Sequence, residues 1–372
     1  PVFRPTPLQF RDFSRFIAAA EPYARRAGLC KIIPPPEWLQ ELHHHQVQER
    51  GLKAEPTVSS APTQRIFLAS DDFPPMRPLV QHFEGSKGIY KQYNVENHRK
   101  VSLSRFYDLC VEARHTPPKS PPLAQPTSLA YTTARQLSIP SLPLQGSDDA
   151  DSMDHMSPAQ QPKLVDYFND LDRNYWRNLS FGPPLYGADI PGTLFPPPPV
   201  FPTWNPQDLG TVLNRINIPM PGVNQPYLYL GMWKSTFAWH VEDMDLYSIN
   251  FLHFGQPKSW YCIPPAHRAR FERAMQSIFP EDARTCSEFL RHKAFLVSPS
   301  ILKSQYDIPV HRLVQTQGEF IITFPNGYHA GFNQGFNCAE SVNFALPSWV
   351  PLGKKAAPCK CIGDSVRIAV EE

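Results

Sequence analysis

Two histidines and one glutamate stand out by their type and spacing. His240 and Glu242 lie two positions apart at the end of an apolar run, and His329 follows a second strand-like run at 319–324. Side chains two apart on a β-strand point to the same face, so His240 and Glu242 can reach one metal ion together. Two histidines and one carboxylate are the ligands that hold non-haem Fe(II) and leave coordination positions open. The spacing therefore predicts a catalytic iron centre.

The segment around this pair strengthens the interpretation. Alone, a His-x-Glu pair is a weak signal, because the chain has 13 histidines and a surface histidine beside a solvated glutamate is the ordinary case. Here aromatic residues precede the pair at 233–239, and a strand-like run follows at 247–254. A turn at 255–257 leads into the run 258–263, which is predicted to return as a strand paired with 247–254. Lys258 would then lie beside the metal-bearing turn, where it could bind an anionic co-substrate.

Four soft ligands form a second set. Cys286 and His292 lie in one segment, and Cys359 and Cys361 lie in another. Two such pairs suit a tetrahedral Cys₃His zinc site, which is structural because no coordination position stays open. The alternative is a set of unrelated thiols near a surface histidine. The other cysteines lie in apolar runs and are expected in the core: Cys30, Cys110, Cys262 and Cys338.

The composition describes a large, proline-rich and nearly neutral chain. Its 372 residues suffice for one large or two moderate domains, and 41% of them are hydrophobic. The 43 prolines exceed the usual share of about one in twenty, which indicates some segments that do not pack. A net charge of +2 does not imply direct nucleic-acid binding.

Seven cysteines, an odd number, favour a reducing compartment. No apolar run approaches the ~20 residues of a membrane span and no signal peptide is recognised. Because the chain begins at Pro1, it is expected to be part of a longer protein.

Short strands and a few helices organise the chain. The first 42 residues form a compact unit with a helical pattern. The histidine run 43–45 is expected on a solvated helix face, because adjacent helical residues diverge in direction. Residues 116–162 are rich in Pro, Ser, Thr and Gln and are expected to be a disordered insertion. From 211 to 344, short strands broken by one helix favour a mainly β fold with helices, a double-stranded β-helix of the cupin or jelly-roll type.

Long motifs in four segments carry a resemblance to a known family. Residues 1–6 and 33–38 resemble a JmjN domain, and residues 231–243 and 324–333 resemble a JmjC domain. Together the chain is similar to the JmjN–JmjC histone lysine demethylases, in particular the subfamily that acts on trimethyl-lysine of histone H3. The resemblance covers nearly the whole chain except 116–162, so that segment is expected to interrupt one catalytic unit.

The resemblance also implies how the chain is divided. The expected regions are a JmjN domain at 1–42, a mixed α/β linking region at 43–115, the insertion at 116–162, a helix and lead-in strand at 163–195, the JmjC catalytic domain with its zinc site at 196–362, and a tail at 363–372.

The resemblance further implies a role for each position of the site. The matches to the iron ligands are His240, Glu242 and His329. The matches that seat the co-substrate 2-oxoglutarate are Tyr186, Lys258, Asn250, Phe237 and Trp260. An ammonium and a phenol hydroxyl can anchor its distal carboxylate by charge-assisted hydrogen bonds. The matches around the methylated peptide are Gly222, Tyr229, Ser341, Gln92, Asn94, Asp189 and Lys293. The matches to the family's structural zinc ligands are Cys286, His292, Cys359 and Cys361.

The resemblance thus implies an Fe(II)- and 2-oxoglutarate-dependent dioxygenase of the nucleus. It would use O₂ to hydroxylate N-methyl groups of tri- and dimethyl-lysine in the histone H3 tail, at lysine-9, lysine-36 or both, and release formaldehyde. Chromatin is the expected partner, and no association with a membrane is expected. Val342 follows Ser341 where the family often carries a second hydroxyl, which leaves the balance between tri- and dimethyl-lysine open.

Two other functions are alternatives. One is a JmjC protein hydroxylase, against which the JmjN unit and Ser341 argue. The other is a non-catalytic chromatin scaffold, against which the complete ligand set together with Tyr186 and Lys258 argues.

Overall fold

The computed structural model describes most of the chain. The described residues are 1–48, 64, 67–68, 73–118, 161–216, 218–361 and 366–370, without the side chains of 113 and 161–166. Nearly all of the predicted insertion at 116–162 lies outside them.

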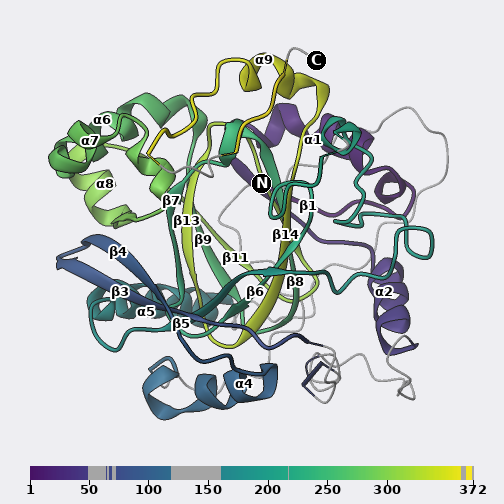
Figure 1. Cartoon of the computed structure of the whole chain (residues 1–372), viewed down its shortest axis with the longest axis horizontal. Helices are drawn as coiled ribbons and strands as arrows, with labels where there is room; N and C mark the ends of the chain where they lie inside the picture. The colour runs from purple at the N-terminus through teal and green to yellow at the C-terminus, as the bar shows by residue number, and fades with distance from the viewer. Residues whose placement is uncertain are drawn as a thin grey trace.

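Two β-sheets form the centre of the described part (Figure 1). The larger sheet has ten strands in the order β1 (Val2–Phe3), β2 (Leu29–Ile32), β12 (Phe320–Thr323), β8 (Tyr247–Gly255), β14 (Asn337–Phe344), β6 (Tyr227–Gly231), β5 (Leu185–Pro191), β3 (Leu79–Ser86), β4 (Ile89–Glu96) and β10 (Phe295–Val297). The smaller sheet has the order β11 (His311–Gln315), β9 (Lys258–Ile263), β13 (Tyr328–Asn333) and β7 (Thr236–His240). The result is a β-rich fold with mixed sheets and helices.

The prediction that the runs 247–254 and 258–263 pair as a hairpin is wrong. β8 pairs with β12 and β14 in the larger sheet, whereas β9 pairs with β11 and β13 in the smaller one. The short turn between them therefore crosses from one sheet to the other. Gly255 permits this with a φ of +98°, where an added Cβ would lie 2.3 Å from the carbonyl oxygen of Phe336.

Alternation along the strands divides the core from an internal cavity. On β8, Tyr247, Ile249 and Phe251 belong to a hydrophobic cluster that also includes residues of the first helix. Between them, Ser248 and Asn250 line a cavity between the sheets. Because β-strand side chains alternate in direction, one strand serves both the core and the cavity.

Helices cover the two sides of the sheets (Figure 1). Their bounds are α1 (Phe13–Ala24), α2 (Pro36–Gln48), α4 (Leu103–Val111), α5 (Gln161–Asn178), α6 (Arg268–Ile278), α7 (Pro280–Thr285), α8 (Pro299–Tyr306) and α9 (Val350–Gly353). The prediction of one helix between 211 and 344 is wrong, because α6, α7 and α8 all lie there. Pro280 and Pro299 each occupy a first-turn position, where proline starts a helix.

Two smaller predictions concern histidines and cysteines. The histidine run 43–45 lies on α2, with His44 exposed and its neighbours half-buried, so the run is only partly a solvated face. The four cysteines expected in the core, Cys30, Cys110, Cys262 and Cys338, are free and buried.

Among the residues that the structure describes, no helix combines the length and apolar character needed to cross a membrane.

A buried ion pair joins the N-terminal unit to the rest of the larger sheet. Lys31 on β2 is fully buried, and its Nζ lies 3.1 and 3.0 Å from the two carboxylate oxygens of Glu319. The same Nζ donates to the carbonyl oxygen of Val314 at 3.1 Å. The amide of Thr316 also donates to Glu319, at 2.7 Å. Both charges are therefore satisfied by partners.

Replacing Lys31 by alanine is expected to destabilise the protein strongly. The change leaves Glu319 buried without its counter-charge, which typically costs roughly 3–5 kcal/mol. Urea unfolding should measure the loss. In the control variant Arg284→Ala, an exposed ion pair is removed, and the unfolding midpoint should stay nearly unchanged because that pair is solvated. Equal effects of the two substitutions would contradict the prediction.

Candidate active site and metal-binding clusters

The structure brings His240, Glu242 and His329 together. His240 ends β7, and His329 on β13 lies directly opposite it in the strand register. Glu242 follows in extended backbone, so its side chain returns to the same side. The Nε2 of His329 lies 3.2 Å from Oε1 of Glu242, and that of His240 lies 4.0 Å from it. One ligand atom from each residue fits within 4.8 Å of the others.

Backbone contacts orient both imidazole rings toward the carboxylate. The Nδ1 of His240 lies 2.7 Å from the carbonyl oxygen of Ala238, and that of His329 lies 3.0 Å from the carbonyl oxygen of Gly327. With Nδ1–H donating, each Nε2 lone pair faces Glu242, the arrangement typical of histidine metal ligands. Three acceptors arranged in this way can hold a metal ion between them. Burial lowers the pKa of His240 to about 3, which favours a metal ion over a proton on this ring.

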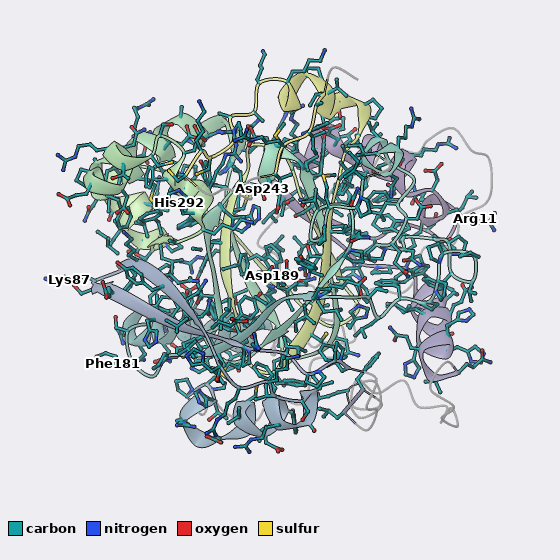
Figure 2. The ribbon with its side chains drawn as sticks, viewed as in Figure 1. Arg11, Lys87, Phe181, Asp189, Asp243 and His292 are labelled. Atoms are coloured by element: carbon teal, nitrogen blue, oxygen red, sulfur yellow. The ribbon has the colours of Figure 1, made fainter. Side chains whose placement is uncertain are left out.

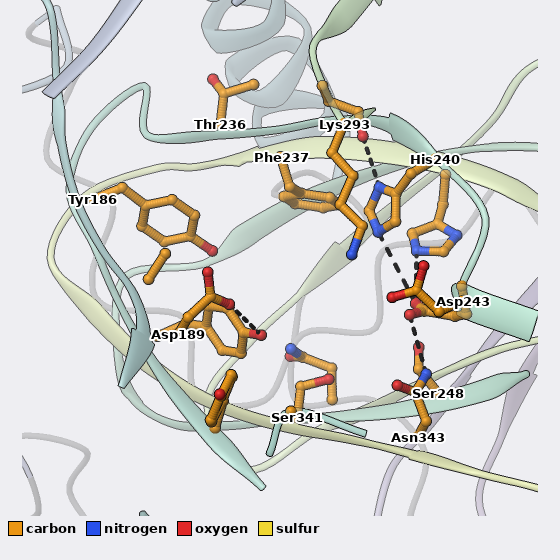
Figure 3. A pocket seen from close by; sticks show the side chains of 18 of the residues that line it. Tyr186, Asp189, Thr236, Phe237, His240, Asp243, Ser248, Lys293, Ser341 and Asn343 are labelled. Carbon is orange, nitrogen blue, oxygen red and sulfur yellow. Dashed lines mark hydrogen bonds and ion pairs between the residues drawn. The ribbon is translucent and has the colours of Figure 1, made fainter. Parts of the chain in front are cut away.

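One cavity of about 300 Å³ collects the predicted site (Figure 3). Figure 3 shows Tyr186, Phe237 and Lys293 directed toward the same central space as His240. The fifteen residues predicted for iron, co-substrate and peptide all line it: Gln92, Asn94, Tyr186, Asp189, Gly222, Tyr229, Phe237, His240, Glu242, Asn250, Lys258, Trp260, Lys293, His329 and Ser341.

Lys258 is a buried basic residue in this cavity. It is 3% exposed, and its Nζ lies 4.8 Å from the ring centre of Phe237 and 5.5 Å from that of Trp260. The hydroxyl of Tyr186 is 3.5 Å away. Within the described ranges no carboxylate pairs with this ammonium group, and burial lowers the pKa of Lys258 to about 7. Such a lysine can bind an anion in the cavity.

Polar atoms without partners line the same space. Oδ1 of Asn250 and Oε1 of Gln92 are buried and have no hydrogen-bond partner. Buried polar atoms normally have hydrogen-bond partners. Two buried acceptors without a partner in one cavity therefore indicate where a ligand can donate a hydrogen bond.

The mouth of the cavity is shaped by a glycine and by charged residues. Gly222 has a φ of +75°, and an added Cβ would lie 2.6 Å from the ring of Tyr227, so only glycine fits. Tyr229 donates to Asp189 at 3.1 Å. Burial acts to lower the pKa of Lys293, but nearby carboxylates, Asp243 first among them, raise it above its usual value.

Sequence reasoning missed two residues beside Glu242. Asn343 donates from Nδ2 to Oε2 of Glu242 at 3.0 Å and to the carbonyl oxygen of Tyr247 at 3.0 Å. Its signal was its position two residues after Ser341 on one strand, which gives both side chains the same direction. Asp243, next to Glu242, also lines the cavity. Val342, by contrast, is 3% exposed in the hydrophobic core and is not among the described residues of the cavity wall.

The four soft ligands also meet, in a second cluster. The Nε2 of His292 lies 3.2 Å from Sγ of Cys359, and Sγ of Cys286 lies 3.7 Å from it. One ligand atom from each of these residues and Cys361 fits within 4.8 Å of the others. A tetrahedron with bonds of about 2.3 Å has ligands about 3.8 Å apart, so the spacing suits zinc. In Figure 2, His292 lies beside α6, α7 and α8, while Asp243 lies nearer the middle of the molecule.

Comparisons with known proteins agree with the fold. A family model described as "JmjC domain, hydroxylase" matches residues 227–344, and one described as "jmjN domain" matches residues 1–34. Lysine-specific demethylase 4B of Mus musculus is 41% identical over 99% of the chain, and lysine-specific demethylase 4D of Rattus norvegicus is 40% identical over 97%. The chain spans 28% and 58% of the length of these relatives, respectively.

The β-rich fold is therefore the cupin-type JmjC fold, joined to a JmjN domain. The chain contains a JmjN domain and a JmjC domain, and over nearly its whole length it is similar to proteins named lysine-specific demethylases. The predicted resemblance is confirmed.

Proposed function

We propose that the chain is an Fe(II)- and 2-oxoglutarate-dependent dioxygenase that demethylates tri- and dimethyl-lysine of histone H3, at lysine-9, lysine-36 or both. One observation carries the proposal: a two-histidine, one-carboxylate cluster lines the same cavity as a buried lysine that has no carboxylate partner among the described residues. The first suits Fe(II), and the second suits the far carboxylate of a small keto acid. The relatives' names, lysine-specific demethylases, support the choice of substrate.

His240, Glu242 and His329 would hold iron, and Asn343 would keep the Glu242 carboxylate in place. Bound iron supplies the activation of O₂, coupled to oxidation of 2-oxoglutarate to succinate and CO₂. Lys258 and Tyr186 would bind the distal carboxylate of the keto acid. Asn250 lines the same cavity and would help to seat the co-substrate, and Phe237 and Trp260 would exclude water around its chain.

The remaining residues would bind the methylated side chain and the peptide. The proposed set is Gly222, Tyr229, Ser341, Gln92, Asn94, Asp189 and Lys293. One oxygen atom of O₂ enters succinate and the other enters the N-methyl group, after which formaldehyde leaves and the lysine nitrogen gains hydrogen. No lone pair on nitrogen is needed, so trimethyl-lysine is a feasible substrate. Such a protein would act on chromatin in the nucleus.

We also propose that the two sheets form a double-stranded β-helix and that the second cluster holds structural zinc. Cys286, His292, Cys359 and Cys361 provide four ligands and leave no coordination position open. Zinc there would fasten the segment after α9 to the helices around α7. The regions predicted along the chain, including the insertion at 116–162, complete this proposal.

Removing Cys359 should release the zinc. Cys359→Ser is expected to lose about one zinc ion per chain by elemental analysis and to unfold at lower urea, because structural zinc contributes folding free energy directly. Cys110→Ser is the matched control, since Cys110 is buried outside the cluster, and should retain its zinc. A native protein without zinc would reject the site.

The test of the function is mass spectrometry of methylated histone H3 peptides incubated with the protein, Fe(II), ascorbate and 2-oxoglutarate. The proposal expects stepwise loss of methyl groups, with formaldehyde and succinate formed together. A stable gain of oxygen without formaldehyde would favour a protein hydroxylase. No consumption of 2-oxoglutarate with any peptide would favour a scaffold.

A further inference from the structure

Gln81 joins the two sheets at the metal-bearing strand. It lies on β3, is 1% exposed, and stands directly opposite Asn94 of β4 in the register. Its Nε2 donates to the carbonyl oxygen of Thr236 at 2.9 Å, and its Oε1 accepts from the amide of Thr236 at 2.7 Å. Thr236 begins β7, the last strand of the smaller sheet, and no described strand pairs with its other edge. The side chain of Gln81 thus takes the place of a neighbouring strand.

These two contacts fix which end of the Gln81 amide is the donor. The backbone N–H of Thr236 can only donate and its carbonyl can only accept, so the amide of Gln81 cannot be turned around. The second hydrogen on Nε2 of Gln81 is then directed to Oδ1 of Asn94, at 3.3 Å. Figure 3 shows Thr236 at the edge of the cavity that contains these residues.

The fixed orientation of the Gln81 amide also determines the orientation of the Asn94 amide in the cavity wall. Oδ1 of Asn94 accepts from Gln81 and also from Nε2 of Gln92, at 2.9 Å, so both of its lone pairs are used. The Nδ2 of Asn94 must therefore point away from these two amides. Oε1 of Gln92 is left buried without a partner. Both residues line the cavity, and among the described contacts Nδ2 of Asn94 and Oε1 of Gln92 are the donor and the acceptor that remain for a ligand.

We propose that Gln81 is a positioning residue that fixes this donor and acceptor so that the cavity binds one main-chain peptide group of the substrate. An extended peptide offers an N–H, which would satisfy Oε1 of Gln92, and a carbonyl, which would accept from Nδ2 of Asn94. This inference rests on the proposed function, because it takes a methylated peptide as the substrate. Gln81 touches neither reactant and acts through its neighbours.

The variant Gln81→Glu tests the proposal while keeping the shape of the side chain. A carboxylate still accepts from the amide of Thr236 but can donate neither to the carbonyl oxygen of Thr236 nor to Oδ1 of Asn94. The amide of Asn94 should then turn, so that its Nδ2 faces residue 81 and its Oδ1 faces the cavity. KM for the peptide should rise about tenfold, the loss of roughly one hydrogen bond. KM for 2-oxoglutarate should change less than twofold.

A series of peptides, each methylated on one backbone nitrogen, separates positioning from folding. The unchanged protein should bind one member of the series about tenfold more weakly than its neighbours, because that member lacks the N–H for Gln92. Gln81→Glu and Gln81→Leu should both lose this discrimination. The control Gln46→Leu removes a buried glutamine of α2 that contacts Leu194 and His253. It should lower stability and keep the discrimination.

The outcomes separate this inference from the proposed function. If no methylated peptide binds to the unchanged protein, both the positioning role of Gln81 and the proposed function are rejected. If peptides bind and Gln81→Glu keeps the same discrimination and peptide KM, Gln81 is only structural and the proposed function stands. Equal rises in KM for peptide and 2-oxoglutarate would likewise overturn the positioning role.

Discussion

Glu242→Ala is expected to reduce turnover below detection while the protein stays folded. The substitution removes the only carboxylate of the three-residue cluster, and a site of two histidines no longer matches the ligand set that holds Fe(II). The three facing acceptors become two, so the substitution removes repulsion in the metal-free protein. Succinate and formaldehyde should be measured at saturating Fe(II), together with the urea unfolding midpoint.

Asn343→Ala provides the graded comparison. This variant keeps all three ligands and removes the hydrogen bond at 3.0 Å to Oε2 of Glu242. Loss of such an outer-shell partner typically costs roughly 10–100-fold in metal affinity or activity. Turnover should therefore be reduced but measurable, and partly restored by more Fe(II). Full activity of Glu242→Ala would show that Glu242 is not an iron ligand and would contradict the proposed chemistry.

The iron ligands and Phe237 lie in the long motifs at 231–243 and 324–333, whereas most of the other predicted cavity residues were assigned through the family resemblance. Residues two apart on a strand share a direction, which brought His240 and Glu242 together without knowledge of the fold. His329 could not be added by spacing alone. Its position opposite His240 depends on β13 pairing with β7, a contact between distant segments.

The wrong hairpin prediction and the missed residues also result from contacts between distant segments. A short turn after Gly255 is compatible with a hairpin or with a crossing between sheets, and local sequence does not distinguish the two. Lys258 nevertheless lies in the predicted cavity, because the crossing carries it to the strand that faces the cavity from the other sheet. Gln81 and Asn343 were missed because their roles come from cross-strand neighbours. Val342, which follows Ser341 where the family often carries a second hydroxyl, lies in the core because side chains alternate in direction along β14.

Lys258→Ala is expected to weaken 2-oxoglutarate binding by two to four orders of magnitude. In the proposed complex the lysine neutralises the far carboxylate inside a cavity lined by Phe237 and Trp260. Removing one partner of a buried charge pair leaves the other uncompensated, typically at roughly 3–5 kcal/mol, and each 1.4 kcal/mol is about tenfold in affinity. The KM for 2-oxoglutarate should rise steeply, whereas Fe(II) binding should survive because no ligand is touched.

A second buried lysine serves as the matched control. Lys234 is 6% exposed, and its Nζ donates to the carbonyl oxygens of Asn178, at the end of α5, and of Phe181 and Gly182, which follow the helix. Lys234→Ala should lower the unfolding midpoint and leave the KM for 2-oxoglutarate unchanged. If both variants raised that KM alike, the effect of Lys258 would be general destabilisation.

The pH dependence gives Lys258 a signature that packing alone would not produce. Burial lowers the pKa of Lys258 to about 7 in the free protein, and a bound carboxylate raises it again. Affinity for 2-oxoglutarate should therefore be full below pH 7 and fall by about tenfold per unit as the pH rises from there toward the pKa of the complex. In Lys258→Ala this decline should disappear, leaving weak binding at every pH. A titration in which the unchanged protein binds 2-oxoglutarate equally well at pH 6.5 and pH 8.5 would mean that the ammonium of Lys258 does not meet the co-substrate.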